Sequence, residues 1–589
     1  MKKLPPDAHP DHLKKQAKAL LRLYRQGDAD AVARFVAFLP AAANRTHDET
    51  LALGLRLHDA QSCIAREYGF ASWADLGAFV DTHALARQAR SLLMRRWLDH
   101  AYGAEVTGGV DAARPRVAAQ LLHDHPDLVS ADPAIACAAG DLAAVKGALA
   151  ADPGWIARAG GVLKLPPLVA VTHSRLGQLP EFAARLRACA RHLLDAGADP
   201  NQRIGNRYPP ASLAEPDESA PLSALYGAAG VNRDPALTAM LLEAGADPND
   251  GESLYHSVEN PACTRLLLEH GARVGGTNAL RRALDMPDAA ALELLLAHGG
   301  DPNEPAGEGP TKTWGAPLLR AIAVRCPARH VAALLAAGAD PGARTVAGVS
   351  AYRLAMQTGL SEVAALLRAA GAQEALDAQD AFMAACARAD ADDARRIQAK
   401  HPELPGALSD DRLRLLPDAA AWGSRDAVKA MVELGWPIAA RGGDWDASAL
   451  NHAVFRGDAE LLAFLLAHGA SWREMHGFGS DALGTLSWAS VNEPEGVGDP
   501  DWEACARVLI AHGVPQAVRD PSNPEGVLID GRAMRFSEAV TDVLLGIDGG
   551  RQPGRQRLSC CATTFRRKLK RRVHDRRKLI RQHLPGSSR

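Results

Sequence analysis

Histidine is the side chain best suited to acid–base or metal chemistry, and five histidines of this sequence invite that question. His270, His298, His468 and His512 each come directly before a glycine that ends a leucine-rich run, whereas His256 does not. A cation near the C-terminal end of a helix is stabilised by the negative end of the helix dipole. We therefore expect structural roles for these four histidines rather than catalysis or metal binding.

No pattern that would position catalytic groups or a cofactor accompanies these histidines. The sequence contains no GxxxxGK[ST] phosphate loop, no GxGxxG after a strand, no HExxH and no GxSxG elbow. The Asp-Pro-Asn strings lack the spacing of a calcium loop, and we expect them to form turns. The sequence therefore predicts a protein that is not an enzyme, with no catalytic residues, no metal site and no cofactor.

The nine cysteines are sparse for a chain of 589 residues, and no two form a CxxC pair. A free cysteine packs as a small hydrophobic side chain, so we expect buried thiols rather than a disulfide framework. Six of them stand alone in helix-like contexts: Cys137, Cys189, Cys263, Cys326, Cys386 and Cys505.

Positive charge is concentrated at the end of the chain. Residues 551–589 contain fourteen Lys or Arg and one acid, Asp575, whereas the other 550 residues contain 53 Lys or Arg and 68 Asp or Glu. The formal total of −2 therefore combines +13 in this basic tail with −15 elsewhere. The side chains that would contact an anionic ligand are Arg566, Arg567, Lys568, Lys570, Arg571, Arg572, Arg576, Arg577 and Lys578.

Several interpretations of the basic tail are open at this point. Phe565 to Leu584 could form a basic helix that binds nucleic acid or an anionic membrane, or this segment could fold back on the acidic part of the chain. It contains one aromatic residue, Phe565, so the interleaved stacking expected of single-strand binders is absent. A disordered, solvated tail and an altered reading frame without function are the other two interpretations.

The elements that must position any functional residue are pairs of short helices. From Ser448 to Trp472, Ser448 is a predicted N-cap, Arg456-Gly457-Asp458 reverses the chain, and Asp458 caps a second helix that ends at Gly469. Neither helix is long enough to be stable alone in water. We therefore expect each pair to pack against neighbours on both sides.

The end of this second helix recurs along the chain. Clear copies are LLDAGADPN (Leu193 to Asn201), LLEAGADPN (Leu241 to Asn249), LLEHGARV (Leu267 to Val274), LLAHGGDPN (Leu295 to Asn303), LLAAGADPG (Leu334 to Gly342) and LLRAAGA (Leu366 to Ala372); weaker copies are VELGWP (Val432) and LIAHGVP (Leu509). The glycines Gly338, Gly371, Gly435, Gly469 and Gly513 lie 33, 64, 34 and 44 residues apart. The period is therefore about 33 residues with insertions.

This chain resembles ankyrin-repeat proteins, whose consensus joins a TPLH-like start of the first helix to an LLxxGADPN-like end of the second. The resemblance covers roughly residues 132–513. It implies an all-α ankyrin-repeat solenoid of stacked helix-turn-helix units with short hairpin loops, which binds proteins through its hairpin tips and concave helical face. The consensus histidine is Asn451 in the best copy. We therefore expect the hydrogen bond from that histidine to the neighbouring turn to be missing.

The N-terminal residues do not follow the repeat and predict a small helical domain ahead of it. The pattern predicts two helices separated at Gly27-Asp28, a polar linker, and then a helix, a turn at Gly69 and a last helix capped by Ser72. The string DAQSCIAREYGFASWADL resembles a helical segment that precedes the repeats in many bacterial ankyrin proteins. The resemblance therefore implies a protein of bacterial type.

Composition and periodicity divide the chain into seven parts. We expect an N-terminal helical segment at 1–85, a helical connector at 86–131, a first array at 132–372, a degenerate repeat or joint at 373–417, a second array at 418–515, a C-terminal extension at 516–550 and the basic tail at 551–589. Insertions at 202–219 and 304–313 fall within the first array, and insertions in solenoids often collect on the binding face.

Six of the ten tryptophans fall in the second array. Trp436 and Trp472 follow helix-ending glycines, and Trp445 precedes Ser448, where a hairpin would project. Because tryptophan is enriched in binding hot spots, Trp436, Trp445 and Trp472 are the predicted partner-binding residues. The alternative is that these rings fill gaps between adjacent hairpins. For the remaining three we expect core packing: Trp422, Trp488 and Trp502.

The sequence as a whole favours a non-enzymatic scaffold that binds an unidentified protein partner through the solenoid and acts as a monomer. The alternative is a regulator directed to nucleic acid or an anionic membrane by the basic tail. The chain has 47% apolar and 23% charged residues, which is typical of globular proteins. No apolar run approaches the length of a membrane span, and the first residues lack a secretory pattern, so we expect a cytoplasmic protein.

Overall fold

The structure is a computed structural model of the chain. It describes residues 2–5, 8–86, 89–305, 315–372, 374–443, 445–492, 494, 497–523 and 526–547. The chain forms two compact units, one made of Met1–Ala283 with Ala290–Gly300 and the other of Leu284–Ala289 with Asp301–Arg589. This division falls inside the predicted first array, and the seven-part division stays a prediction.

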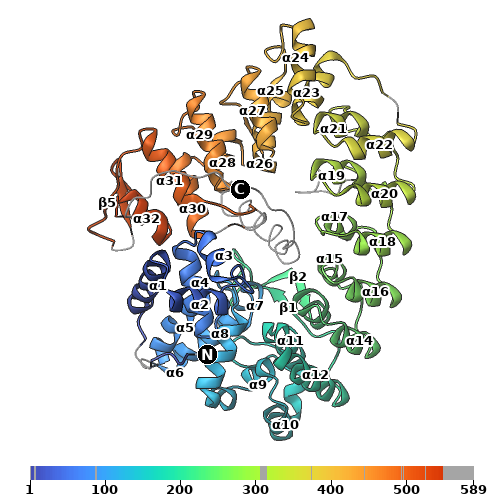
Figure 1. The fold of residues 1–589 in the computed structure, drawn as a ribbon. Helices are drawn as coiled ribbons and strands as arrows, with labels where there is room; N and C mark the ends of the chain where they lie inside the picture. Colours follow the sequence, from blue (N-terminus) through green and yellow to red (C-terminus); the bar gives the residue numbers. More distant parts are fainter. Residues whose placement is uncertain are drawn as a thin grey trace. The chain divides into compact units, whose positions relative to one another are not determined.

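Helix-turn-helix pairs recur in both units, and the fold is an all-α ankyrin-repeat solenoid (Figure 1). The pair α28 (Ala449–Phe455) and α29 (Ala459–Ala467) begins and ends where the sequence predicts. The hydroxyl of Ser448 accepts from the Asn451 N–H, and Asp458 Oδ1 accepts from the Leu461 N–H at 3.0 Å. Gly469 has φ +97°, a left-handed conformation that glycine adopts without a Cβ penalty.

The first unit begins with five helices: α1 (Pro10–Arg25), α2 (Ala29–Phe38), α3 (His47–Ala52), α4 (Leu57–Glu67) and α5 (Trp73–Ala86). Asp28 caps α2 and Ser72 accepts from the Asp75 N–H at 3.1 Å, which confirms both predicted helix starts. The prediction of a polar linker is wrong where α3 lies. Thr46 and Glu49 form a capping box there, and so short a helix shows no apolar periodicity in the sequence.

Glu67, in the string DAQSCIAREYGFASWADL, is buried, with 1% of its side chain exposed. It accepts from Lys2 Nζ at 2.6 Å and from Arg34 Nη2 at 2.8 Å. Burial opposes ionisation of this carboxyl, but the hydrogen bonds from Arg34 and Lys2 outweigh it and lower the pKa of Glu67. The string thus ties the N-terminus and α2 to α4.

The rest of the first unit continues as helix pairs. Its elements are α6 (Arg90–Ala101), α7 (Ala104–Thr107), α8 (Pro115–Asp124), η1 (Pro126–Ala131), α9 (Pro133–Ala139), α10 (Leu142–Ala151), η2 (Pro153–Ala157), α11 (Pro167–Thr172), η3 (Arg175–Gln178), α12 (Pro180–Asp195), α13 (Ala224–Tyr226), the π-helix η4 (Gly227–Asn232), α14 (Pro235–Glu243), α15 (Ser253–Ser257), α16 (Pro261–Glu269), α17 (Ala279–Ala283) and α18 (Ala290–Ala297). Second helices contact one another in sequence order from α12 through α14 and α16 to α18.

The insertion predicted at residues 202–219 contains a hairpin that the sequence did not indicate. Strands β1 (Arg203–Asn206) and β2 (Asp217–Ser223) pair antiparallel, with Ile204 opposite Leu222. Beside them Arg207 is 5% exposed and donates to the carbonyls of Val106 and Leu163 at 2.9 and 2.6 Å. The hairpin is therefore held by contacts distant in sequence.

The second unit contains the remaining pairs and a small sheet. Its elements are α19 (Pro317–Ala323), α20 (Ala328–Ala336), α21 (Ala351–Gln357), α22 (Ser361–Ala369), α23 (Ala378–Ala387), α24 (Ala391–Lys400), α25 (Asp410–Leu413), α26 (Leu415–Trp422), α27 (Arg425–Glu433), β3 (Arg441–Gly442), β4 (Ala447–Ser448), α28, α29, α30 (Ala482–Asn492), α31 (Trp502–Ala511), β5 (Val518–Arg519), β6 (Val527–Ile529), β7 (Arg532–Met534) and α32 (Glu538–Leu544). The weak copy at 373–417 thus still forms a helix pair, and the extension forms a sheet in the order β5-β6-β7.

Asparagines of the Asp-Pro-Asn turns bridge successive repeats. Asn201 donates to the Gly245 carbonyl at 3.2 Å and accepts from the Asp247 N–H at 2.8 Å. Asn303 makes the same pair of bonds to Gly338 and Asp340, at 2.9 and 2.8 Å. Each such asparagine is therefore a polar bridge, here called an asparagine rung, to the turn of the next repeat.

Candidate functional site

Two of the predicted partner-binding tryptophans lie in the core of the second unit. Trp436 is 3% exposed and stacks on Phe382 with ring centroids 6.1 Å apart. Trp472 is 7% exposed, and the Arg473 guanidinium lies 4.1 Å from the centre of its ring. Both indoles fill space between helices in this structure.

Trp445, the third predicted tryptophan, lies between β3 and β4 and is half-buried. Its ring makes edge-to-face contacts with His452 at 4.8 Å and His476 at 4.9 Å. It also lies 5.6 Å from Phe455, at the end of α28. The tip of the hairpin thus folds back on the first helix of its repeat and meets the next hairpin turn.

The ring contacts continue from Trp445 to a surface that is open to solvent. Phe455 stacks on Trp488 of α30 at 5.7 Å, and His476 lies 6.0 Å from Phe478. The most exposed apolar side chains nearby are Met475 (48%), Val491 (42%), Trp488 (40%) and Phe478 (37%). We call this set the aromatic patch: Trp445, Phe455, Met475, His476, Phe478, Trp488 and Val491.

The other three tryptophans of the second array differ in how deeply they are buried. The prediction that Trp488 packs in the core is wrong, because Trp488 is 40% exposed, whereas Leu486 and Ala489 of the same helix are buried. Trp422 and Trp502 are partly buried and pack against the core, as predicted.

Main-chain hydrogen bonds hold the turn that carries Met475, His476 and Phe478 of the aromatic patch. The Gly477 N–H donates to the Trp445 carbonyl at 3.0 Å, and the His476 N–H donates to the Ser480 carbonyl at 2.9 Å. A Cβ at Gly477 would lie 2.9 Å from the Trp445 oxygen, closer than a real Cβ approaches. Glycine at this position therefore lets the two hairpin turns pack directly together.

The expectation that Asn451 makes no hydrogen bond to the neighbouring turn is wrong. Its amide Nδ2 donates to the Glu474 carbonyl at 3.0 Å, and its Oδ1 accepts from the Thr485 hydroxyl at 3.0 Å. The hydrogen bond to the neighbouring turn, expected to be lost with the consensus histidine, is therefore present. The amide is long enough to reach the turn and also to link α28 to α30.

The charges around the aromatic patch are largely paired. Arg441 contacts Asp446 at 2.8 Å, and Arg473 lies 3.4 Å from Asp530. Burial lowers the pKa of His476, which favours its neutral form against Trp445. Over residues 418–547 the sequence has 19 Asp or Glu and nine Lys or Arg, a net charge of −10. The patch is thus an apolar surface on an acidic array.

The helix-ending histidines cap their helices, which supports the structural role predicted for them. The Nδ1 atoms of His270, His298, His468 and His512 lie 2.8 to 2.9 Å from the carbonyl four residues earlier. Each of those carbonyls also accepts from the backbone N–H of the same histidine at 3.1 Å, so the ring adds a second contact at the helix end. Among the described residues, no group of three or more His, Cys, Asp or Glu could hold a metal ion.

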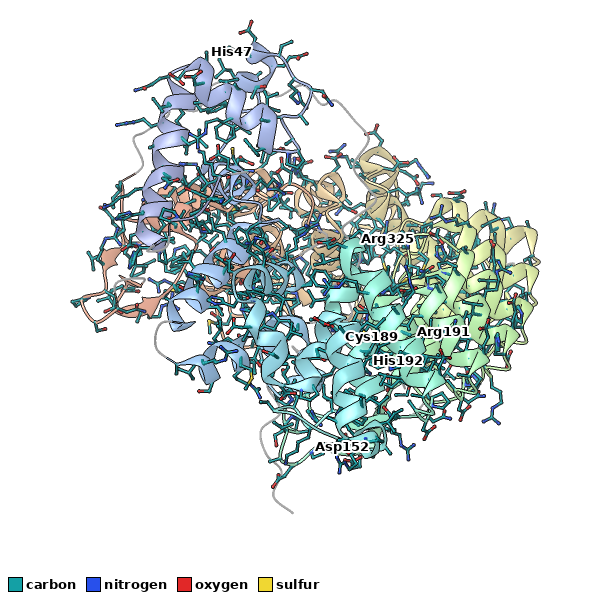
Figure 2. The ribbon with its side chains drawn as sticks, turned by 90° about the horizontal axis from the view of Figure 1, so that it is seen from below. His47, Asp152, Cys189, Arg191, His192 and Arg325 are labelled. Atoms are coloured by element: carbon teal, nitrogen blue, oxygen red, sulfur yellow. The ribbon has the colours of Figure 1, made fainter. Side chains whose placement is uncertain are left out.

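The six cysteines predicted to be buried are buried. Figure 2 shows one of them, Cys189, on α12 together with Arg191 and His192. Burial raises the pKa of Cys189 to about 11 and that of Cys386 to about 12. Such thiols stay protonated and are poor nucleophiles at neutral pH.

Two further predictions concern the basic tail and membrane-spanning helices. The nine basic side chains from Arg566 to Lys578 lie outside the described residues. Over the part of the chain that the structure describes, no helix combines the length and the apolar character needed to cross a membrane.

Sequence reasoning missed most of the aromatic patch. Phe455, Met475, Phe478 and Val491 were not singled out, although Met475 to Phe478 place two large apolar side chains in a turn, where small polar residues are usual. That local excess was the available signal. The meeting of these residues with Trp445 and Trp488 depends on contacts between repeats.

Comparison with known proteins returns ankyrin-repeat structures. No family model matches the chain, and no curated protein matches it. Among solved structures, an ankyrin repeat domain from Acinetobacter baumannii is 26% identical, with 34% of this chain and 97% of that chain covered and a TM-score of 0.27. The ankyrin repeat domain of human ASB11 is 22% identical, with 40% and 99% covered and a TM-score of 0.20.

Proposed function

We propose that this protein is a non-enzymatic binding module and that the aromatic patch is the surface that binds its protein partner. The observation that carries the proposal is the continuous set of rings from Phe478 through Trp445 to Trp488, which leaves Met475 and Val491 beside it in solvent. Contiguous exposed apolar surface rimmed by polar residues is typical of protein interaction sites.

The construction of the aromatic patch supports this function. Each ring contacts another ring, and the turn at Gly477 is fixed by main-chain bonds, so little side-chain freedom remains to be lost on binding. Preorganised aromatic anchors of this kind dominate the energetics of many interfaces. Of the three tryptophans predicted as anchors, only Trp445 belongs to the patch. Trp488, which was predicted to lie in the core, is its second tryptophan.

Our proposal keeps the monomeric state and cytoplasmic location predicted from the sequence. It replaces Trp436 and Trp472 by Phe478 and Trp488 as the side chains to test, because the first two are almost fully buried.

Affinity capture with the full chain and matched variants tests the proposal. Cell lysate is passed over the wild-type chain, over Trp488→Ala with Phe478→Ala, and over Val346→Ala, and bound proteins are identified by mass spectrometry. Val346 is 99% exposed and lies outside the aromatic patch, so its variant removes an exposed apolar side chain without touching the site. We expect a discrete protein bound by wild type and Val346→Ala and lost, by tenfold or more in affinity, from the double variant. Equal capture by all three would exclude the patch as the binding surface.

A further inference from the structure

We propose that the basic tail, residues 551–589, docks on the aromatic patch of the same chain and so competes with the external partner. The competition rests on the proposed function, whereas the docking itself does not. The occupant is inferred from where the chain leaves the described structure, from charge, and from the spacing of apolar residues in the tail.

A segment close to the end of the described chain lies against the helix that carries part of the aromatic patch. The Ser487 hydroxyl donates to the Arg535 carbonyl, and the Ser537 N–H donates to the Ser490 hydroxyl at 3.2 Å. Both serines are on α30, on either side of Trp488 in sequence. The segment that leads to α32 is therefore fixed against the helix that carries two residues of the patch.

The distance from α32 to the patch is within reach of the tail. Helix α32 has seven residues and is about 10 Å long, and the described chain ends at Ile547. Seventeen residues separate Ile547 from Phe565, and seventeen residues can span up to about 60 Å. Phe565 can thus reach any ring of the patch, and its attachment to the same chain gives it a high effective concentration there.

Charge favours the tail over other occupants. The array around the patch has a net charge of −10 over residues 418–547, and the tail has +13. Opposite net charges attract the two segments, and salt weakens that attraction. Arginine also binds the faces of tryptophan and phenylalanine rings, and Trp488 and Phe478 of the patch are 40% and 37% exposed.

The tail also carries apolar side chains at a spacing suited to such a surface. Phe565, Leu569 and Val573 are four residues apart, and Ile580 and Leu584 repeat that spacing. Residues at these intervals share one face of a helix, and a helix that lays an apolar face on a hydrophobic surface is a common mode of peptide recognition.

Limited trypsin digestion of the full chain tests the docking, because trypsin cleaves on the C-terminal side of Lys and Arg, which are frequent in the tail. Cleavage rates from Arg566 to Arg581 are measured by mass spectrometry for wild type, for Trp488→Ala with Phe478→Ala, and for Val346→Ala. At low salt we expect the double variant to be cleaved about fivefold faster than wild type, and Val346→Ala to match wild type. At about 0.5 M salt the three rates should converge.

A second variant probes the same contact from the tail. Arg571→Glu with Arg572→Glu leaves the folded array unchanged, and we expect it to accelerate cleavage at Lys578 and to increase capture of the external partner. Protection that salt removes but the double variant of the patch does not would place the tail on another acidic surface and overturn the proposal. Equal cleavage of all variants at low salt, or protection that begins only when duplex DNA or anionic vesicles are added, would also overturn it.

The two proposals fail separately. Protection of the tail by the patch, without any partner lost from the double variant, would leave the docking standing and remove the proposed function. A partner lost from the double variant, without protection of the tail, would support the proposed function and exclude the docking.

Discussion

The regions predicted as the first and second arrays join their repeats by different chemistry. Asn201 and Asn249, in the first array, are exposed and bridge successive turns by hydrogen bonds. The corresponding positions of two repeats in the second array hold Ala439 and Arg473, and no rung is formed by them in the described chain. Buried Trp436 and the turn contacts of Asn451 join the repeats there instead.

This difference links stability to function. Exposed hydrogen bonds exchange with water and contribute about 1 kcal/mol each, whereas a buried indole contributes several kcal/mol. The second array therefore depends on hydrophobic contacts, and the same kind of contact continues through Trp445 to its surface. Among the described residues of 132–372, the large apolar side chain that is exposed is Val346.

The strongest test of this comparison is Trp436→Ala. The ring is buried and stacked on Phe382, so removing it leaves a cavity and should destabilise the second unit by about 3–5 kcal/mol. The measurement is the urea midpoint of hydrogen-exchange protection in residues 378–470. Val346→Ala, an exposed control, should change it by less than about 0.5 kcal/mol. A small effect of Trp436→Ala would mean that hydrophobic contacts do not join these repeats.

Acid should weaken the first unit through two buried histidines. Burial lowers the pKa of His100 and of His173 to about 4, from about 6.5 in the unfolded chain. Below pH 6.5 the unfolded chain binds protons that the folded unit excludes, so stability falls as the pH drops to about 4 and then levels off. The loss is roughly 3 kcal/mol for each histidine.

Hydrogen exchange of first-unit peptides between pH 7 and pH 4, corrected for the intrinsic rate, measures this loss. The variant His100→Gln keeps a polar side chain near Thr82, which lies 3.0 Å from His100 Nε2, but binds no proton. It should therefore reduce the pH dependence by about half. An unchanged slope would show that His100 does not contribute.

Removal of one asparagine rung should cost less. Asn249→Ala loses the donor to the Gly271 carbonyl and the acceptor of the Arg273 N–H, both exposed, and should destabilise the first unit by about 1–2 kcal/mol. Asn492→Ala is the control, because exposed Asn492 donates to the Trp488 carbonyl within its own helix. Thermal unfolding of both variants makes the comparison, and equal shifts would mean that the rung adds nothing.

The smallest effect on stability is expected at the aromatic patch. Trp488 is 40% exposed, so Trp488→Ala should cost about 1 kcal/mol or less in a urea titration, although the same variant should lose the partner. A loss as large as that of Trp436→Ala would assign Trp488 to the core. Loss of the partner by this variant could then no longer be attributed to the aromatic patch.

The elements that the sequence predicted well are those with local signals. Ser448, Asp458 and Gly469 set the ends of α28 and α29 by bonds to residues a few positions away. The same holds for Asp28 and Ser72 in the N-terminal helices. Caps and apolar periodicity are readable within one turn of helix, so these predictions needed no knowledge of neighbouring repeats.

The features that were missed depend on residues far apart in sequence. Trp436 is buried because Phe382, 54 residues earlier, stacks on it, and the sequence alone left its position undecided. Trp488 meets Phe455 across 33 residues, and this contact turns single apolar residues into a surface. Side-chain type indicated tryptophan as the anchor, but burial decided which tryptophans are accessible.

The asparagine rungs also show that the same contact can join residues at different separations along the chain. The rung from Asn201 reaches a carbonyl 44 residues away, and the rung from Asn249 reaches one only 22 residues away. The extra residues of the longer repeat lie largely in the β1–β2 hairpin, which leaves the rung unchanged. The repeats therefore tolerate variable segments at their hairpins without loss of stacking. This protein could accept foreign peptide loops there as a display scaffold.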